Sequence, residues 1–230
     1  MKLDAMSRPP ARSVPSKRRG RTPGPPLALK KRPAQQRATE TFERVLEAAA
    51  QALADVGFDR LSTNVICRRA GLTPPALYRY FPNKYAVLCE LGRRLMLRQN
   101  ALIDLWITSE ALEGGEGALR SALQGLMLDT HRLTSETVGG AWITRALRAV
   151  PALSAVRLAS HRQVTEEQTR RLRKVFPQAD AAELRTVSRV TVELLYSAVE
   201  MLFDEPSLDV RAVSTVISSM VASYRLYLKE

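Results

Sequence analysis

The sequence predicts an all-α protein, with a small helix-turn-helix head of three helices followed by a larger helical body. Three observations support this fold class. Apolar residues recur at helical spacing from residue 39 onward, no stretch alternates as a strand would, and glycine and proline fall mainly between the periodic stretches. A chain of 230 residues that is 45% hydrophobic can build such a core. We expect a tail at residues 1–37, the head at 38–84 and the body at 85–230.

The formal net charge of +12 belongs to the tail rather than to the whole chain. Residues 1–37 hold eleven Lys or Arg and one acid, Asp4, whereas the remainder holds 24 basic and 22 acidic residues. The tail also carries seven of the thirteen prolines and few large apolar side chains, so its composition predicts disorder. Its basic stretch Lys17–Gly24 suits an arm in a DNA minor groove. The alternative is a solvated tail that raises non-specific affinity by charge alone.

The stretch from Leu61 to Lys84 predicts two short helices joined by a tight turn. The hydroxyls of Ser62 and Thr63 suit the start of the first helix. Gly71 falls where a left-handed residue would end that helix. The expected turn is therefore short and contains glycine, as in a helix-turn-helix.

The second helix of this pair is expected from Pro74 to about Phe81. Thr73 suits its cap, the two prolines Pro74 and Pro75 sit in its first turn, where a missing N–H costs nothing, and Pro82 stops it. Spacing alone also fits an ordinary helix pair in an all-α core.

The residue order through this region goes beyond spacing. It runs Phe42, Val45, Leu46, Ala49, Leu53, Gly57 and Phe58, then Ser62, Thr63, Ile66, Ala70 to Thr73, Leu77 to Phe81, and Lys84. This order resembles the DNA-binding domain of the TetR family of transcriptional regulators over about residues 39–95. Two positions depart from the family pattern: Cys67 stands where alanine is usual and Pro75 where glycine is frequent.

The resemblance implies that the second helix enters the major groove of DNA. Thr73, Pro74, Pro75 and Ala76 are small enough for close approach and for methyl contacts to thymine, and Arg79 can reach guanine or a phosphate. In the family, the positions of Thr63, Tyr78, Tyr80 and Lys84 commonly contact the DNA backbone, and their donor groups suit that role. Leu77 and Phe81 are expected to pack inside the head.

Helical periodicity continues beyond the head. Asn83 suits the cap of a long helix at 84–108, and further helices are expected at 118–133, 141–150, 152–175, 181–203 and 208–228. The last two are apolar over most of their girth, so a second copy of the chain is expected to cover them. The alternative is that both fill the core of one subunit. The expected dimer residues are Leu194, Leu195, Ala198, Leu202, Val213, Ile217, Met220 and Tyr224.

The resemblance also implies a ligand pocket in the body. The candidate lining residues, which also suit plain core, are Met96, Trp106, Leu123, Met127, His131 and Trp142. Because they carry almost no charge, we expect a small uncharged or amphipathic effector.

Several function classes lack support in the sequence. His131 and His161 are the only histidines, and no phosphate loop, nucleophile elbow or metal-ligand spacing accompanies them, so no enzyme and no cofactor are expected. Cys67 and Cys89 are expected to be free thiols. No apolar run approaches the ~18 residues of a membrane span, and no signal core is present, so we expect a cytoplasmic protein.

These observations predict a homodimeric transcription regulator, more specifically a repressor, that binds a near-palindromic operator in double-stranded DNA. The resemblance implies that an effector in the body changes the spacing of the two heads. An architectural or non-specific DNA-binding protein that relies on the basic tail is the alternative. An enzyme or carrier on a helical scaffold is the third reading.

Overall fold

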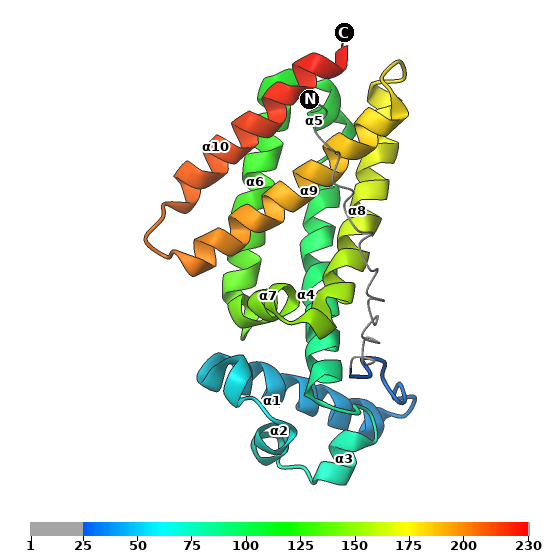
Figure 1. Ribbon diagram of the computed structural model, residues 1–230, viewed down its shortest axis with the longest axis vertical. Helices are drawn as coiled ribbons and strands as arrows, with labels where there is room; N and C mark the ends of the chain where they lie inside the picture. Colours follow the sequence, from blue (N-terminus) through cyan, green and yellow to red (C-terminus); the bar gives the residue numbers. More distant parts are fainter. Residues whose placement is uncertain (1–24, 230) are drawn as a thin grey trace, which may run out of the picture.

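The computed structural model describes residues 25–229, and over these residues it is helical without strands, which confirms the predicted fold class (Figure 1). The head consists of α1 (Gln36–Arg60), α2 (Thr63–Ala70) and α3 (Pro74–Tyr78). The body consists of α4 (Lys84–Trp106), α5 (Ser109–Glu113), α6 (Gly115–Glu136), α7 (Gly140–Ala149), α8 (Ser154–Val175), α9 (Ala181–Asp204) and α10 (Val210–Ser223), with 3₁₀ turns at Pro151–Leu153 and Tyr224–Lys229.

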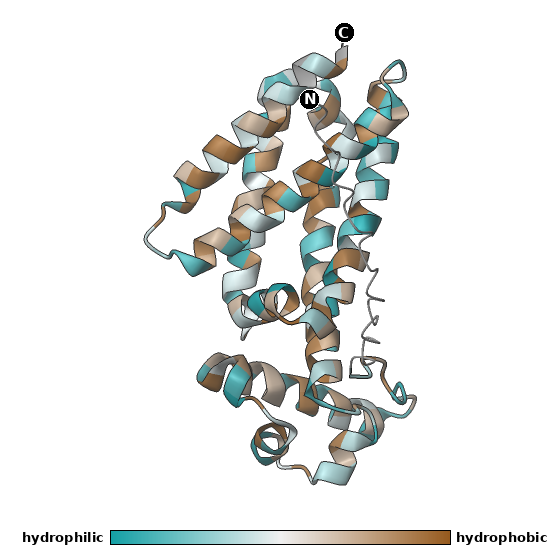
Figure 2. Ribbon diagram, in the orientation of Figure 1, coloured by the Kyte–Doolittle hydropathy of each residue, from teal (hydrophilic) through white to brown (hydrophobic). Residues whose placement is uncertain are grey.

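The head packs around aromatic side chains from both ends of its sequence. Phe42 of α1 stacks on Phe81 with 4.8 Å between ring centroids, and Tyr80 meets Phe42 edge to face at 5.7 Å. Figure 2 shows the apolar residues of α1 alternating with polar ones along the helix, as expected when one face is buried. Gly57 interrupts α1 with φ 70°, a left-handed backbone conformation that favours glycine.

Helix α4 is the link between head and body, since it starts at the head and runs up through the centre of the body (Figure 1). Helices α6 and α8 pack beside it, and α9 and α10 form an outer layer over α8 and α6. Helix α7 lies between this bundle and α1. Movement within the body therefore has two routes to the head, through α4 and through α7.

Three of the differences between the element boundaries and the sequence expectation have an identifiable local feature. Helix α3 ends at Tyr78 rather than Phe81, because the amides of Tyr80 and Phe81 both donate to the carbonyl of Leu77 in a closing turn. Helix α5 was not predicted; Thr108 caps it by accepting a hydrogen bond from the amide of Ala111 at 3.2 Å. Helix α10 ends at Ser223 and tightens into a 3₁₀ turn.

The predicted tail lies mostly outside the described residues, and so does its stretch Lys17–Gly24. Residues 25–35 are described, and they precede α1 as an irregular segment without helix. Within the described part of the chain, no helix is long and apolar enough to cross a membrane. Both Cys67 and Cys89 are free thiols, and burial raises the pKa of the Cys67 thiol.

Candidate nucleic-acid interface and effector cavity

The turn between α2 and α3 has the geometry that its residues predict. Ser62 accepts a hydrogen bond from the amide of Val65 at 3.2 Å and so caps α2. Gly71 ends α2 in the left-handed region, with φ 61°. The side chain of Thr73 makes no capping hydrogen bond at the start of α3, contrary to expectation, and its carbonyl accepts from the amide of Ala76 instead.

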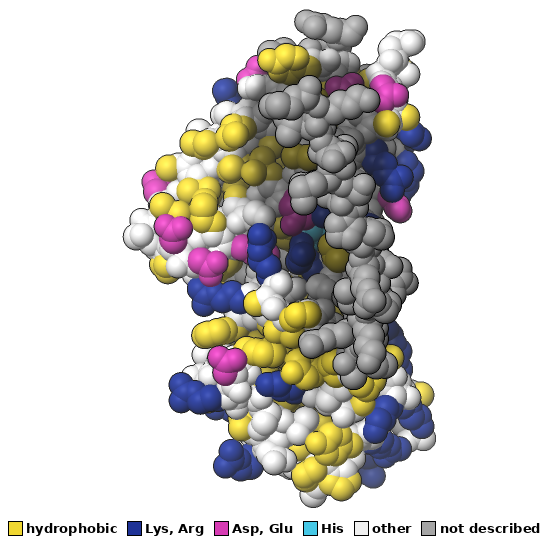
Figure 3. Space-filling view, in the orientation of Figure 1, with side chains coloured by type: hydrophobic (Ala, Val, Ile, Leu, Met, Phe, Trp, Pro, Cys, Tyr) yellow, Lys and Arg dark blue, Asp and Glu magenta, His cyan; other side chains and the backbone are white. Residues whose placement is uncertain are grey.

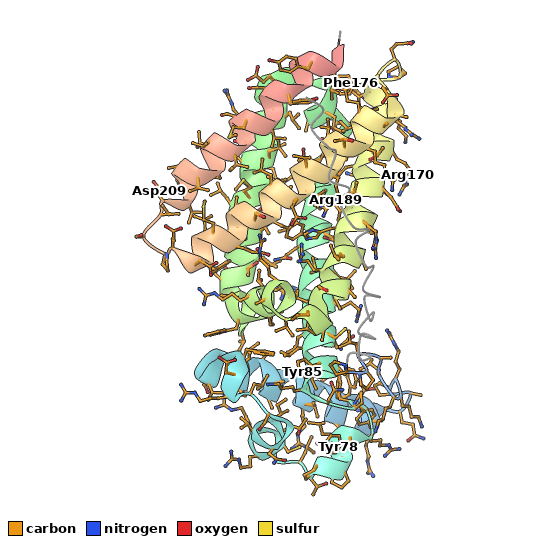
Figure 4. All side chains as sticks on the ribbon, in the orientation of Figure 1. Tyr78, Tyr85, Arg170, Phe176, Arg189 and Asp209 are labelled. Carbon is orange, nitrogen blue, oxygen red and sulfur yellow. The ribbon has the colours of Figure 1, made fainter. Side chains whose placement is uncertain are left out.

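The solvent face of α3 carries most of the residues expected at DNA. Thr73, Pro74, Pro75 and Arg79 are exposed, Ala76 is half-buried, and Leu77 beneath them is fully buried. Figure 4 places Tyr78 at the end of the head farthest from the body. The hydroxyls of Tyr78, which is 40% exposed, and Thr63 lie 3.1 Å apart, so one hydrogen bond joins the two helices at the surface.

Tyr80 and Lys84, both expected at the DNA backbone, instead make contacts within the head. Tyr80 is only 2% exposed and packs on Phe42. The ammonium of Lys84 donates to the carbonyls of Phe58 and Leu61, at 3.2 and 2.9 Å, and sits 4.4 Å from the centre of the Phe58 ring. These two side chains hold the head together, and we assign them to its framework rather than to its surface.

Two arginines on α2 were not among the expected DNA contacts. Arg68 and Arg69 are exposed at the end of α2, and Arg69 pairs with Asp55 of α1. Nearby, Arg44 donates to the carbonyl of Ala70 at 2.6 Å and closes the end of α2. The sequence signal that could have singled out Arg68 and Arg69 is the helical spacing of the apolar residues of α2. That spacing leaves the two arginines outside the buried face.

A cavity of about 100 Å³ lies in the body among α4, α6, α8, α9 and α10. Its walls are mostly aliphatic, and none of the described residues that line it carries a charge. Its polar wall residues are Gln99, Thr130, Gln168, Ser188, Thr191, Tyr196 and Tyr224.

Only two of the six expected ligand residues, Leu123 and Met127, line this cavity. Met96 is buried in the core that the head shares with the body, and Trp106 donates to a carboxylate oxygen of Asp129 at 2.9 Å. His131 stacks on the ring of Phe203, with 4.8 Å between centroids.

The sixth residue, Trp142, lies where the body meets the head. A side chain on Gly57 of α1 would come within 3.2 Å of the Trp142 ring, and the Arg145 guanidinium lies 5.3 Å from that ring. Helical spacing put these six residues on suitable faces, but it did not reveal which face each helix turns to the cavity.

Some polar groups of the cavity wall have a hydrogen-bond partner and others do not. The amide of Gln99 donates to the Thr134 hydroxyl at 2.9 Å. The side-chain amide nitrogen of Gln168 is buried and has no hydrogen-bond partner among the described residues. An unpaired buried amide costs free energy unless a bound molecule or water completes it.

Tyr196 connects the cavity wall to α4. Its hydroxyl donates to the Asn100 side-chain oxygen at 2.8 Å, and the Asn100 nitrogen donates to the Ser160 hydroxyl at 3.0 Å. Its ring stacks on His161 at 4.4 Å. Burial raises the pKa of Tyr196, so the hydroxyl keeps its proton as a donor. One residue therefore contacts the cavity and also the helix that leads to the head.

The expected dimer residues divide between the interior and the surface. Ala198 and Leu202 are each 4% exposed, and Leu195 lines the cavity, so these three belong to the subunit interior. Leu194, Val213 and Ile217 are half-buried. Met220 and Tyr224 are exposed.

Val190 and Val216, which the expected set omitted, are each 58% exposed. Apolar side chains gather over α9 and α10 in Figure 3. We call the exposed set the α9–α10 face: Val190, Val216, Met220 and Tyr224.

The head matches a known protein family. Residues 45–91 match the family model described as "Bacterial regulatory proteins, tetR family". A 52-residue segment is 36% identical to an uncharacterized HTH-type transcriptional regulator of Mycobacterium tuberculosis strain H37Rv, Rv2250c. That segment covers 23% of this chain and 28% of the relative, so the likeness to this regulator is confined to a minor part of both proteins.

Solved structures extend the likeness to the fold of most of the chain. The repressor of the multidrug efflux pump SmeDEF from Stenotrophomonas maltophilia, SmeT, aligns with a TM-score of 0.61 and 20% identity, covering 81% of this chain and 90% of that chain. The fatty acid degradation regulator FadR from Bacillus halodurans aligns with a TM-score of 0.59 and 18% identity, covering 84% and 97%. At these identities the alignments show a shared fold. Together the comparisons show that residues 45–91 match the tetR family of bacterial regulatory proteins and that the fold of the chain is the one shared by these solved regulators.

Proposed function

We propose that the protein is a dimeric transcription regulator that binds operator DNA through α3 and releases it when a small molecule fills the body cavity. The observation that carries the DNA-binding part is the exposed α3 face. Thr73 to Arg79 present small residues and one guanidinium above a fully buried support, which is what close approach to base edges needs. Tyr78 and Thr63 supply neutral donors for phosphate oxygens.

The exposed α9–α10 face supports the dimeric part of this proposal. Val190, Val216 and Met220 expose more than half of their surface, although each is large and apolar. They lie on the adjacent helices α9 and α10, and Tyr224 follows directly after α10. Contiguous apolar surface of this kind is typical of protein interfaces. Two copies joined there would present two α3 helices, and an inverted repeat in the operator would match their two-fold axis.

The cavity supports an uncharged, mainly apolar effector with one hydrogen-bond acceptor. Its described walls carry no charge, and the unpaired amide of Gln168 is a ready donor. The volume of about 100 Å³ is somewhat below the ~150 Å³ of an apolar protein cavity that holds benzene, so a one-ring compound fits after a small expansion. The neighbour SmeT is also described in a complex with triclosan.

Tyr196 supports a route from this cavity to the head. A ligand that pushes on its ring would shift the hydroxyl that holds Asn100 on α4. A ligand changes DNA affinity only through a difference in its affinity for the two arrangements of α4. In this proposal the effector favours the arrangement of α4 that fits the operator less well, so effector binding releases DNA, which is the behaviour of a repressor relieved by its effector.

The test is selection of bound sequences from a random duplex pool with the full-length protein. We expect an enriched inverted repeat whose half-sites lie about one helical turn apart, ~34 Å, or somewhat more. Specific regulators exceed their own non-specific affinity by ~10³ or more. Binding without any enriched sequence would overturn the proposal in favour of an architectural DNA-binding protein.

A further inference from the structure

The segment before α1 lies against the head, although its composition predicts disorder. We call residues 25–32 the arm. Its residues alternate in exposure. Leu27 and Leu29 are half-buried and pack against the core of the head, whereas Ala28 and Lys30 are exposed. This alternation is that of an extended segment with one face on a surface. Two leucines thus fix which side of the arm faces solvent.

Two hydrogen bonds fix the arm in position along the head. The amide of Lys30 donates to the carbonyl of Tyr80 at 2.9 Å. The side-chain nitrogen of Asn83 donates to the carbonyl of Pro26 at 3.0 Å, while its oxygen caps α4 by accepting from Ala86 at 2.9 Å. Both anchor points, Tyr80 and Asn83, lie in the short connection between α3 and α4. The arm is therefore fixed beside the C-terminal end of the helix proposed to read DNA.

The outer side of the arm is basic and uncompensated. Lys30, Lys31 and Arg32 are consecutive and exposed, and residues 25–37 contain no acid. None of the three forms an ion pair with a described residue. Several arginines of the body differ in this respect, since Arg94 is paired with Glu43, Arg148 with Glu200 and Arg171 with Asp104. Arg79, also exposed, directly precedes the residue whose carbonyl holds Lys30.

We propose that the docked arm is a second DNA contact, in which Lys30, Lys31 and Arg32 bind backbone phosphates next to the half-site that α3 reads. The inference rests on the proposed DNA binding and adds a defined contact to it. Three exposed cations beside α3 meet a phosphate backbone with little competition from acidic neighbours. Docking matters because an arm already held in place loses less conformational entropy on binding than a free tail.

The experiment measures affinity for the selected operator against salt concentration for three variants of the full-length protein. The first is the triple variant Lys30→Ala, Lys31→Ala, Arg32→Ala. The second is a matched control, Arg120→Ala, Arg173→Ala, Lys174→Ala, which removes the same charge from exposed positions at the far end of the body. The third is Leu27→Gly with Leu29→Gly, which keeps every charge but removes the side chains that dock the arm. Thermal unfolding of each variant establishes that the fold is intact.

We expect the arm triple variant to bind at least tenfold more weakly at low salt. Its slope of log K against log salt concentration should become shallower by about 0.9 for each phosphate that a subunit no longer neutralises. The control triple variant should keep both the affinity and the slope close to those of the unaltered protein, with the affinity changed by no more than about twofold. The leucine variant should lose a large part of the same affinity, because its charges are no longer held beside α3.

Equal losses of affinity in the two triple variants would overturn the inference, since net charge alone would then explain them. Normal binding by the leucine variant would also overturn it, since a free tail would then serve equally well. If the unaltered protein bound no duplex DNA at all, the proposed function itself would fail, which is a different result from failure of the arm alone.

Discussion

The head and the α8–α9 layer of the body use their polar side chains in opposite ways. Around the head, Lys84 ties α4 to two carbonyls, and Arg94 makes paired hydrogen bonds of 2.6 and 2.7 Å to Glu43 of α1. Burial opposes the charged form of Glu90, but hydrogen bonds from Arg93 and Arg94 outweigh it and hold the pKa of Glu90 below its usual value. Each of these groups has its partner.

In the α8–α9 layer, several side chains keep one nitrogen without a hydrogen-bond partner, even where another atom of the same side chain is paired. Four buried side-chain nitrogens have no hydrogen-bond partner among the described residues, and all belong to these two helices: Arg157, His161, Gln168 and Arg189. The cavity lies against the same layer. The comparison indicates a division of labour. The head is built to keep one shape for the DNA, whereas the body has space and unpaired donors that a ligand or water can complete.

The largest expected effect tests the rigidity of the head. Phe81 is fully buried and stacks on Phe42. Replacing it with alanine should cost about 3–5 kcal/mol through lost burial and the cavity left behind. Thermal and denaturant unfolding would measure this loss. The matched change Phe203→Ala, at a half-buried site in the body, should cost less and should leave DNA binding intact. An equal cost for both would contradict the view that the head is the better packed region.

The next effect separates positioning from base readout on α3. Tyr78→Phe removes a hydroxyl at the phosphate-facing edge and should weaken binding to every duplex alike, by about 1 kcal/mol or roughly fivefold. Arg79→Ala should change the order of preferred sequences as well as the affinity. Binding to a panel of operator variants measures both. Equal losses on every site for both variants would contradict the assignment of the two roles.

The third prediction concerns the unpaired amide of Gln168. Acetophenone and ethylbenzene have similar shapes, but only the first has an acceptor oxygen. Gln168→Leu should weaken acetophenone binding about five- to tenfold and leave ethylbenzene binding unchanged or stronger. Gln163→Leu, at an exposed position of the same helix, is the control. Ligand-induced shifts in melting temperature measure the difference, and a parallel change for both compounds would rule out the proposed hydrogen bond.

The fourth prediction tests the link from the cavity to α4. Tyr196→Phe keeps the ring in the cavity wall but removes its hydrogen bond to Asn100. Acetophenone or ethylbenzene, whichever binds the unaltered protein, should bind this variant with an affinity within a few fold of its affinity for the unaltered protein. The bound compound should nevertheless reduce the DNA affinity of the variant less than it reduces that of the unaltered protein. Operator binding with and without the compound measures the coupling. Full retention of the response would assign the signal to the α7 contact instead.

The smallest effect is the pH dependence of stability at His161. Its ring nitrogen Nδ1 lies 3.1 Å from Glu193, with Arg157 and Arg189 on the same carboxylate. Burial lowers the pKa of His161 from 6.5, with the two arginines adding to this, although Glu193 opposes it. The folded state therefore binds this proton less well than the unfolded state. Stability from this site should be complete above pH 6.5 and decline as the pH falls below it.

Unfolding measured between about pH 7.5 and about pH 5.5 tests this dependence on both sides of the unfolded-state value. His161→Gln should flatten the decline, whereas His131→Gln serves as a comparison for a histidine that is less buried. An unchanged pH profile in His161→Gln would show that other groups cause the decline.

The sequence by itself determined the elements that depend on local chemistry. Ser62, Gly71 and Asn83 predicted the helix ends that the structure contains, because caps and left-handed turns involve only neighbouring backbone. The order of residues around them also predicted the family. Helical periodicity predicted most of the body helices for the same reason, since spacing along the chain defines a buried face without naming its partner.

The tertiary structure decided which face meets which neighbour. It put Ala198 and Leu202 inside the subunit and Val190 and Val216 outside. Both helices are apolar nearly all round, so a small rotation of each helix about its axis decides which apolar residues are buried. It also turned Lys84 inward onto carbonyls contributed by residues more than twenty positions earlier. The arm docks for a similar reason. Two leucines are too few to form a core of their own, but they bury apolar surface once the head provides a site for them.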